Sequence, residues 1–201
     1  MADQDPAIAP SDTRTNLLKT AWRLIENRGV DSVTLGDIAA AAKVSRQAVY
    51  LHFGSRAGLF IAMTRYRDAN SIHVRKMVAA AQKTDIRAGF DRFVRCWFQH
   101  AVNILPVARA LEAAALSDAD ARTAWGERME DLRRAIRPLI DRLADSGQLI
   151  DGWSRDQATD WMWSRTHLDV WSQLAVDRKW KPEEVARRVA ASLWTDLVGD
   201  R

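Results

Sequence analysis

The sequence predicts an all-α protein of about nine helices, in which a small N-terminal helical domain precedes a larger helical domain. Beyond the first 60 residues the apolar residues keep helical spacing, Gly is scarce, and no strand signal is visible. The first 60 residues contain short helical patterns separated by tight turns. With 47% hydrophobic and 28% charged residues, the 201-residue chain has the balance of a globular protein with one sizeable core or two small ones.

The N-terminus predicts a disordered arm and a first helix. Residues 1–11 are acidic and Pro-containing without an apolar core, which favours an arm without regular structure. A helix over residues 12–28 has an apolar stripe, and Gly29 ends it in the position favoured after the C-cap. We expect this helix to open a three-helix domain that spans residues 12–54.

Two short helices joined by a tight turn follow the first helix. Thr34 is a good N-cap for one of them, and Asp37 three residues later makes an acidic variant of the capping box. Lys43 and Val44 interrupt that helix, and Ser45 can cap another that runs to about residue 52. Two short helices in this order are typical of DNA-binding helical pairs.

The second short helix carries polar side chains on one side and apolar side chains on the other. Val49 and Phe53 share the apolar side, whereas Arg46, Gln47 and Tyr50 share the polar side. In a DNA major groove, Arg can pair bidentately with guanine and Gln with adenine. The stretch therefore indicates a helix-turn-helix whose second helix is the recognition helix.

The run T-L-x-D-I-A-x-x-A-x-V-S-R-x-x-V-Y-x-H-F-x-S-R-x-x-L-F, residues 34–60, resembles the DNA-binding domain of the TetR (tetracycline-repressor) family of bacterial transcriptional regulators. The resemblance covers roughly residues 14–65, and the Y-x-H-F run is its most specific part. A bare helix-turn-helix pattern is weak evidence, but the whole run near the N-terminus of a chain of this size is strong. The resemblance implies a dimer that binds double-stranded DNA and a small molecule.

The resemblance also implies which residues touch DNA. Side chains of the second short helix would face the groove, and hydroxyl and basic groups near the helix starts would hold phosphates. The implied DNA-binding residues are Thr34, Lys43, Ser45, Arg46, Gln47, Ala48, Tyr50, Leu51, His52 and Arg56. Packing or capping is the competing interpretation for His52, Ala48 and Leu51.

Three positions depart from the pattern of the family. Lys43 stands where the family often has Gly in the turn, so it must manage without the freedom of Gly, and its ammonium could instead meet a phosphate. Gln47 stands where a small residue is frequent and adds a readable amide. Gly36 has no side chain where some members place a base-reading one, so specificity should depend more on Arg46 and Gln47.

Positive charge gathers on the same segment. Residues 14–67 contain nine basic and three acidic residues, a net charge of +6, whereas the whole chain carries +4. A solvated helical surface explains any one of these charges. The asymmetry is better explained by neutralisation of DNA phosphates.

The remaining residues predict a connecting helix and a C-terminal helical domain. A helix over residues 55–80 is expected to link the DNA-binding domain to residues 81–201, a ligand-binding and dimerisation domain. Further helices are predicted over residues 85–103, 106–116, 118–146, 155–179 and 183–198.

Eight of the nine Trp residues lie from residue 97 onward, which leaves two interpretations open. They could pack in a core or an interface, or some could line a pocket for an apolar or aromatic ligand. The last two helices have wide apolar faces and resemble the helices with which the family dimerises. The predicted dimer interface is Trp161, Leu168, Trp171, Ala175, Val185, Val189, Leu193, Trp194 and Leu197.

An effector pocket is expected among the middle helices. Its predicted lining, inferred from position alone, is Phe93, Trp97, His100, Ala101, Leu111, Trp125, Met129 and Leu132.

No catalytic, metal or cofactor site is visible in the sequence. The four His residues are scattered, and neither a phosphate-binding Gly-rich loop nor a nucleophile elbow occurs. We therefore expect no enzyme activity, no cofactor and no metal. The single Cys96 in an apolar run predicts a buried thiol, and the absence of a signal peptide or membrane span favours the bacterial cytoplasm.

The sequence thus predicts a sequence-specific transcriptional regulator. The favoured interpretation is a repressor that binds a palindromic operator as a homodimer and is released by an apolar or aromatic small molecule. An activator or a ligand-insensitive regulator would use the same parts. A non-specific helical DNA-binding or interaction protein is the other alternative, but it leaves the outward face of the second short helix unexplained.

Overall fold

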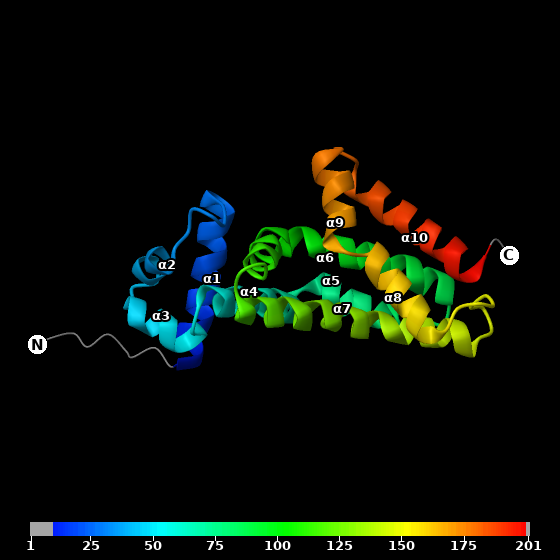
Figure 1. The fold of residues 1–201 in the computed structure, drawn as a ribbon, viewed down its shortest axis with the longest axis horizontal. Helices are drawn as coiled ribbons and strands as arrows, with labels where there is room; N and C mark the ends of the chain where they lie inside the picture. The colour runs from blue at the N-terminus through cyan, green and yellow to red at the C-terminus, as the bar shows by residue number, and fades with distance from the viewer. Residues whose placement is uncertain (1–9, 200–201) are drawn as a thin grey trace, which may run out of the picture. The chain divides into compact units, whose positions relative to one another are not determined.

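The computed structural model describes residues 10–199, and every regular element in this range is helical (Figure 1). In chain order the elements are α1 (Pro10–Arg28), α2 (Leu35–Ala41), α3 (Arg46–Phe53), α4 (Arg56–Asn70), α5 (Ile72–Ala80), α6 (Ile86–Ala114), α7 (Ala119–Asp145), α8 (Arg155–Arg165), α9 (Leu168–Trp171), the π-helical turn η1 (Ser172–Asp177) and α10 (Pro182–Val198). The prediction of an all-α fold is confirmed. Across residues 10–199, no helix combines the length and apolar character needed to span a membrane.

The predicted N-terminal arm, residues 1–11, falls almost wholly outside the described residues. Its last two residues belong to α1, which begins at Pro10 instead of at residue 12. The chain forms two compact units. The first unit ends at Asp68 and also takes in Pro106–Trp125, while the second comprises Ala69–Leu105 and the residues from Gly126 onward.

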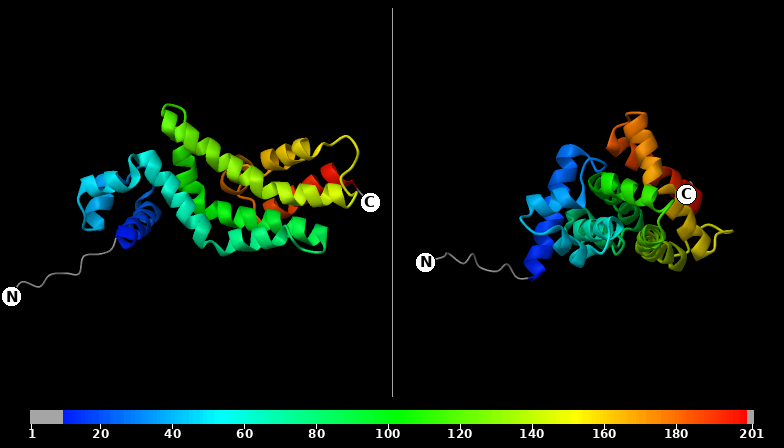
Figure 2. Two further views of the ribbon diagram at one scale, coloured as in Figure 1. Left: turned by 90° about the horizontal axis from the view of Figure 1, so that it is seen from below. Right: turned by 60° about the vertical axis from the view of Figure 1, so that its left-hand side comes forward.

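The core of the first unit is built from one apolar face of each of its helices. Its members from α1, α2, α3, α4, α6 and α7 include Leu17, Leu18, Trp22, Ile38, Val49, Phe53, Leu59, Met63, Val107, Leu111 and Ala121. The indole N–H of Trp22 donates to the Met63 carbonyl over 3.2 Å, so the one polar atom of this buried ring is satisfied. Within this unit α2 and α3 lie beside α1 as a compact pair (Figure 2).

Contacts of Phe and Trp side chains hold the second unit together. Phe90 of α6 meets Trp194 of α10 edge to face, with ring centroids 5.5 Å apart. The Trp97 indole donates to the Thr166 carbonyl over 2.7 Å, and the Trp153 indole donates to the Asp196 carbonyl over 3.0 Å. Trp97 and Trp153 thus combine apolar packing with hydrogen bonds that join α6 to the end of α8 and α10 to the loop before α8.

The predicted single connecting helix over residues 55–80 is two helices. α4 ends at Asn70, and Ser71 caps α5 by accepting hydrogen bonds from the His73 and Val74 N–H groups over 3.2 and 3.3 Å. Apolar periodicity continues through the junction, which is why the sequence pattern alone predicted one helix. The Ser cap is the local feature that starts a new helix.

The helices predicted over residues 85–103 and 106–116 are one helix, α6, with Pro106 inside it. A Pro in a helix interior costs about 3 kcal/mol. Ile104, Val107 and Leu111 on either side are fully or almost fully buried, and burial of such side chains contributes about 1.5–3 kcal/mol each. Their burial therefore outweighs the cost of Pro106, and the helix continues through it.

The helix predicted over residues 155–179 is divided into α8, α9 and η1. α8 ends at Arg165, and the side chain of His167 starts α9 by accepting a hydrogen bond from the Asp169 N–H over 3.3 Å. The Thr166 carbonyl at the break accepts the Trp97 indole N–H instead of continuing the helix. A tertiary contact therefore determines this break.

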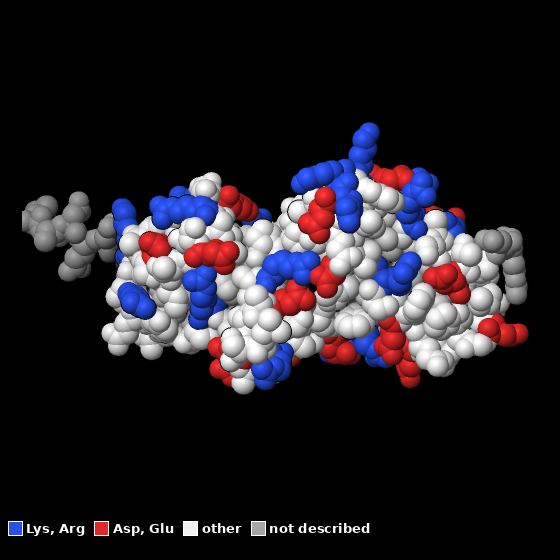
Figure 3. Space-filling view, turned by 45° about the horizontal axis from the view of Figure 1, so that its top comes forward, with Lys and Arg blue, Asp and Glu red and all other residues white. Residues whose placement is uncertain are grey.

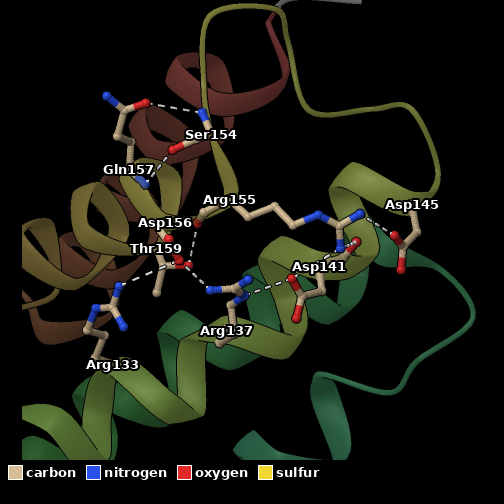
Figure 4. Close-up of polar contacts among 9 residues, drawn as sticks. All are labelled: Arg133, Arg137, Asp141, Asp145, Ser154, Arg155, Asp156, Gln157 and Thr159. Carbon is tan, nitrogen blue, oxygen red and sulfur yellow. Dashed lines mark hydrogen bonds and ion pairs between the residues drawn. The ribbon is translucent and has the colours of Figure 1, made fainter.

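An alternating chain of charges joins α7 to α8 (Figure 4). Arg133 and Arg137 bind Asp160 and Asp156 with closest distances of 2.6 and 2.5 Å. The same chain continues through Asp141, which Arg137 and Arg155 approach to 2.8 and 3.2 Å. Because these groups are partly exposed, each ion pair contributes little to stability alone. Together, this ladder of ion pairs mainly fixes the register of α7 against α8.

Candidate nucleic-acid interface

The first helix of the motif, α2, is fixed at its start by a reciprocal cap. The Thr34 hydroxyl accepts a hydrogen bond from the Asp37 N–H over 3.1 Å, and the Asp37 carboxylate accepts the Thr34 N–H over 2.8 Å. The Thr34 hydroxyl and the Thr34 N–H both donate to the Asp37 carboxylate, and these two hydrogen bonds hold the pKa of Asp37 below its ordinary value. Leu35 and Ile38 are buried, so the predicted capping box and apolar face are both present.

The turn between α2 and α3 is a Schellman motif. The Val44 N–H binds the Ala39 carbonyl over 3.0 Å, and the Lys43 N–H binds the Ala40 carbonyl over 3.2 Å. Lys43 has φ +57°, the left-handed conformation that usually belongs to Gly. Lys43, in place of the Gly that is frequent in the family, therefore strains the backbone of the turn, and its side chain is exposed there.

The second helix, α3, is fixed at both ends. Its N-cap is Ser45, whose hydroxyl accepts a hydrogen bond from the Ala48 N–H over 3.1 Å. Its C-cap is Gly54, with φ +71°. Val49 and Phe53 are buried and anchor the inner side of α3 in the core of the first unit.

The outer side of α3 presents polar and apolar groups to solvent. Arg46 and Gln47 are exposed, Tyr50 is 41% exposed, and Leu51 is 81% exposed. Guanidinium and amide groups can pair with base edges, and an aliphatic side chain can contact a thymine methyl. At this exposure the Leu51 side chain does not pack in the core and is accessible to a partner.

Arg46 and Tyr50 lie together one helical turn apart. The Arg46 guanidinium approaches the Tyr50 hydroxyl to 3.4 Å and stands 5.7 Å from the centre of its ring. The hydrogen bond is long and therefore weak, but both contacts restrict the rotamers of two exposed side chains. The pair points away from the buried Val49 and Phe53, in keeping with the predicted division of the helix.

Two of the residues predicted to hold phosphates are already engaged within the protein. The Thr34 hydroxyl donates to the Asp37 carboxylate over 2.6 Å, so a phosphate contact by this group would require that bond to break. The Arg56 guanidinium donates to the Val30 carbonyl over 2.7 Å and lies 5.2 Å from the centre of the Phe60 ring. Arg56 thus ties the loop after α1 to α4, with its remaining N–H groups exposed.

Two further predicted contacts, Ala48 and His52, lie at intermediate exposure on α3. The ring of His52 stands 6.0 Å from that of Phe53, so its neighbour on the inner side is a core residue.

One residue that fixes this motif was missed by the sequence argument. A Cβ placed at Gly58 of α4 would lie 1.9 Å from the Phe53 carbonyl oxygen at the end of α3. Only Gly permits this close approach of α4 to the last turn of α3. The signal available in the sequence was a Gly inside an otherwise helical apolar pattern, which costs about 1 kcal/mol and therefore needs a packing reason.

The residues predicted to line an effector pocket are mostly buried. Leu111 belongs to the core of the first unit, with Trp125 packed against it. In the second unit Phe93, Trp97, His100, Ala101 and Leu132 are buried and Met129 is partly buried. Three hollows of the second unit, of about 510, 320 and 470 Å³, are lined by other side chains, so the pocket stays a prediction.

The residues predicted for the dimer interface fall into two groups. Six of them are buried within the single chain, with Val185, Leu193 and Leu197 completely inaccessible: Leu168, Trp171, Val185, Val189, Leu193 and Leu197. These six belong to the core of the protomer and have little or no side-chain surface for a partner. Trp161, Ala175 and Trp194 are partly exposed and keep surface that a partner could cover.

Comparison with known proteins gives matches over the motif and over the whole fold. Residues 17–63 match the family model for bacterial regulatory proteins, tetR family. The HTH-type transcriptional regulator AcrR of Shigella flexneri is 41% identical over 59 residues, which are 29% of this chain and 27% of that protein. The HTH-type transcriptional repressor AcnR of Corynebacterium glutamicum is 24% identical over 140 residues, 70% of each chain.

A similar fold is found over nearly the whole chain. A transcriptional regulator from Saccharomonospora viridis, in complex with choline, has a TM-score of 0.73 at 19% identity, covering 95% of this chain and 100% of that one. The AcrR match, by contrast, spans about a quarter of the length of that relative.

The fold and the exposed face of α3 define a helix-turn-helix motif in which α3 occupies the position of a recognition helix. Residues 17–63 are therefore similar to the N-terminal domain of bacterial regulatory proteins of the tetR family, and the fold is similar to that of solved regulators over nearly the whole chain.

Proposed function

We propose that this protein is a sequence-specific transcriptional regulator, a repressor that binds a palindromic operator as a homodimer and is released by a small molecule. The outer face of α3 carries the proposal. Arg46, Gln47, Tyr50 and Leu51 are exposed on a helix that is capped at both ends and anchored by Val49 and Phe53, so a rigid element presents base-reading groups.

The proposal assigns the flanking groups to the DNA backbone. The Lys43 ammonium stands at the turn, and the Ser45 hydroxyl keeps its hydrogen while its oxygen accepts from Ala48. Free N–H groups of Arg56 offer a further phosphate contact, and the net charge of +6 over residues 14–67 attracts DNA. On the face shown in Figure 3, basic and acidic side chains are interspersed. We therefore expect specific contacts to contribute more to DNA binding than one continuous region of positive potential.

A palindromic operator requires two copies of α3 about 34–36 Å apart, one DNA turn. We assign the dimer contact to the exposed flank of α8 and α10. There Trp161 is partly exposed, and Arg165 donates to the Ser192 hydroxyl over 3.4 Å. This assignment moves the interface away from the buried positions such as Leu193 and onto neighbouring positions that keep solvent-accessible surface.

The relative AcnR is named a repressor, which favours repression here, while an activator would use the same contacts. A small molecule would release DNA only by binding more tightly to the conformation with the lower DNA affinity.

The test is selection of bound fragments from random and genomic DNA libraries at physiological salt, followed by sequencing. We expect a palindromic consensus with half-sites about one turn apart, and a dimer by light scattering. Recovery of DNA without a consensus would favour the non-specific helical DNA-binding alternative. Recovery of no DNA would reject the proposal.

A further inference from the structure

A basic hollow of about 470 Å³ lies in the second unit, against the hairpin of α5 and α6. Lys76 of α5, Lys83 of the turn after α5, and Arg92 and Arg95 of α6 line it. The other lining residues are Ala88, Asp91, Cys96 and Gln99. Arg95 also lines the two neighbouring hollows and therefore borders all three. The volume is within the range of small-ligand sites.

None of these four cations forms an ion pair with an acidic side chain among residues 10–199. Two nearby acids are already used. Asp91 pairs with Arg87 at 3.1 Å, and Asp85 accepts the Ala88 N–H over 2.9 Å at the start of α6. Arg92 and Arg95 are three residues apart on α6, a spacing at which like charges repel. The hollow therefore gathers four positive charges against the single carboxylate of Asp91, which already pairs with Arg87.

The backbone that carries these cations is held in place. A Cβ at Gly89 of α6 would lie 2.6 Å from the Ala80 carbonyl oxygen, so only Gly allows α6 to approach the end of α5 this closely. Arg142 of α7 donates to the Ala81 carbonyl over 2.7 Å and to the Lys83 carbonyl, which fixes the turn between the two helices. The hollow is therefore positioned before any ligand arrives, which lowers the entropic cost of binding.

Cys96 lies in the same lining as these cations. Burial raises the pKa of the Cys96 thiol, although the nearby positive charges of Arg92, Lys76 and Arg95 act to lower it. The thiol is therefore protonated and unreactive near neutral pH, and it forms part of the lining. The positive charges are thus available to a ligand and are not needed to stabilise a thiolate.

We propose that this hollow binds a small oxyanion that carries several negative charges, with phosphate or carboxylate groups as the recognised chemistry. Arg92 and Arg95 would bind its oxygen atoms through guanidinium N–H groups, and Lys76 and Lys83 would neutralise the remaining charge. The site differs in place and in polarity from the apolar pocket that the sequence suggested. Binding itself does not depend on the proposed function, whereas any effect on DNA affinity rests on it.

Calorimetric titration of the full chain, without DNA, tests the proposal. The two probes are inorganic pyrophosphate and propane-1,2,3-tricarboxylate, which separate a phosphate ligand from a carboxylate ligand. We expect one of them to bind with a dissociation constant below about 1 mM and to bind more weakly as salt is raised to about 0.15 M. Failure of both probes to bind would overturn the proposal.

Variants decide whether binding occurs at this hollow. The double variant R92Q/R95Q should bind the better probe at least about tenfold more weakly, because it loses two charged hydrogen-bond donors. Arg75→Gln is the matched control, since Arg75 is exposed on α5 beside Lys76 but does not line the hollow. The pair K76Q/K83Q provides a second test if the first variant misfolds. Unchanged affinity in folded variants would overturn the proposal.

Binding of DNA is measured separately, with and without the better probe. A change in operator affinity that disappears in R92Q/R95Q would identify the site as regulatory. Loss of operator binding in the parent protein would count against the proposed function but not against the oxyanion site.

Discussion

Replacement of Gly58 by Ala tests how closely α3 and α4 must approach in the DNA-binding motif. The added Cβ would lie 1.9 Å from the Phe53 carbonyl oxygen and 3.1 Å from its carbon. Carbon–oxygen contacts between unbonded groups are ordinarily longer than about 3.3 Å. The two helices must therefore separate by about an ångström, which opens the packing around the buried Phe53.

Overpacking of this kind costs about 1–3 kcal/mol, and the preference of helices for Ala returns about 1 kcal/mol at most. Because the clash is with backbone and is severe, we expect Gly58→Ala to destabilise the first unit by about 2–3 kcal/mol. That loss corresponds to a decrease in Tm of about 4–12 °C for a chain of this size. Specific DNA binding should fall further, since α3 is displaced.

Gly36→Ala is the matched control. A Cβ at Gly36 meets only the Thr34 hydroxyl oxygen, at an ordinary distance of 3.5 Å. The variant should gain about 0.5–1 kcal/mol from helix propensity. Thermal and urea unfolding followed by circular dichroism measure both effects. Equal stability of Gly58→Ala and the parent, or equal damage from the two substitutions, would refute the packing argument.

Three further outcomes are expected. Lys43→Gly should stabilise the first unit by up to about 1 kcal/mol in urea unfolding, because it relieves the left-handed φ of +57°, and a loss of stability would contradict that assignment. Leu51→Ala should leave stability within about 0.5 kcal/mol because Leu51 is 81% exposed, yet weaken binding to the selected operator; unchanged affinity would remove Leu51 from the interface. Desolvation raises the pKa of Asp141, but hydrogen bonds from Arg137 and Arg155 outweigh it and leave the pKa below its ordinary value. The ion pairs of Asp141 therefore stabilise the fold above about pH 4, and this stabilisation is lost as pH falls through the lowered pKa of the folded state. Asp141→Asn should therefore reduce the loss of unfolding free energy at acid pH, measured by urea unfolding between pH 7 and 2. An unchanged profile would mean that the ladder does not couple folding to pH.

The helix-turn-helix was predictable because its signals are local. Thr34 with Asp37, and Ser45 alone, cap the helices that the sequence assigned to them, and Val49 and Phe53 lie on the buried side as their spacing predicts. These features depend on residues three or four positions apart. Tertiary packing therefore had little opportunity to override them.

The missed features depend on distant contacts. The break between α8 and α9 involves Trp97, 69 residues away from Thr166, and the need for Gly58 arises only when α4 crosses the end of α3. Periodicity showed that Leu193 and Leu197 are buried but could not show what covers them. For the same reason the spacing of cations on α5 and α6 did not reveal that they line one hollow.

The central claim, that α3 reads bases directly, is tested most directly by a double-mutant cycle. One axis is Arg46→Ala, and the other is substitution of each base pair in turn within the half-site recovered by selection. We predict a coupling free energy of about 1–3 kcal/mol between Arg46 and a single G·C pair, and near zero elsewhere, from dissociation constants measured at fixed salt. Uniform weakening at every position would make Arg46 a phosphate contact and would contradict the account.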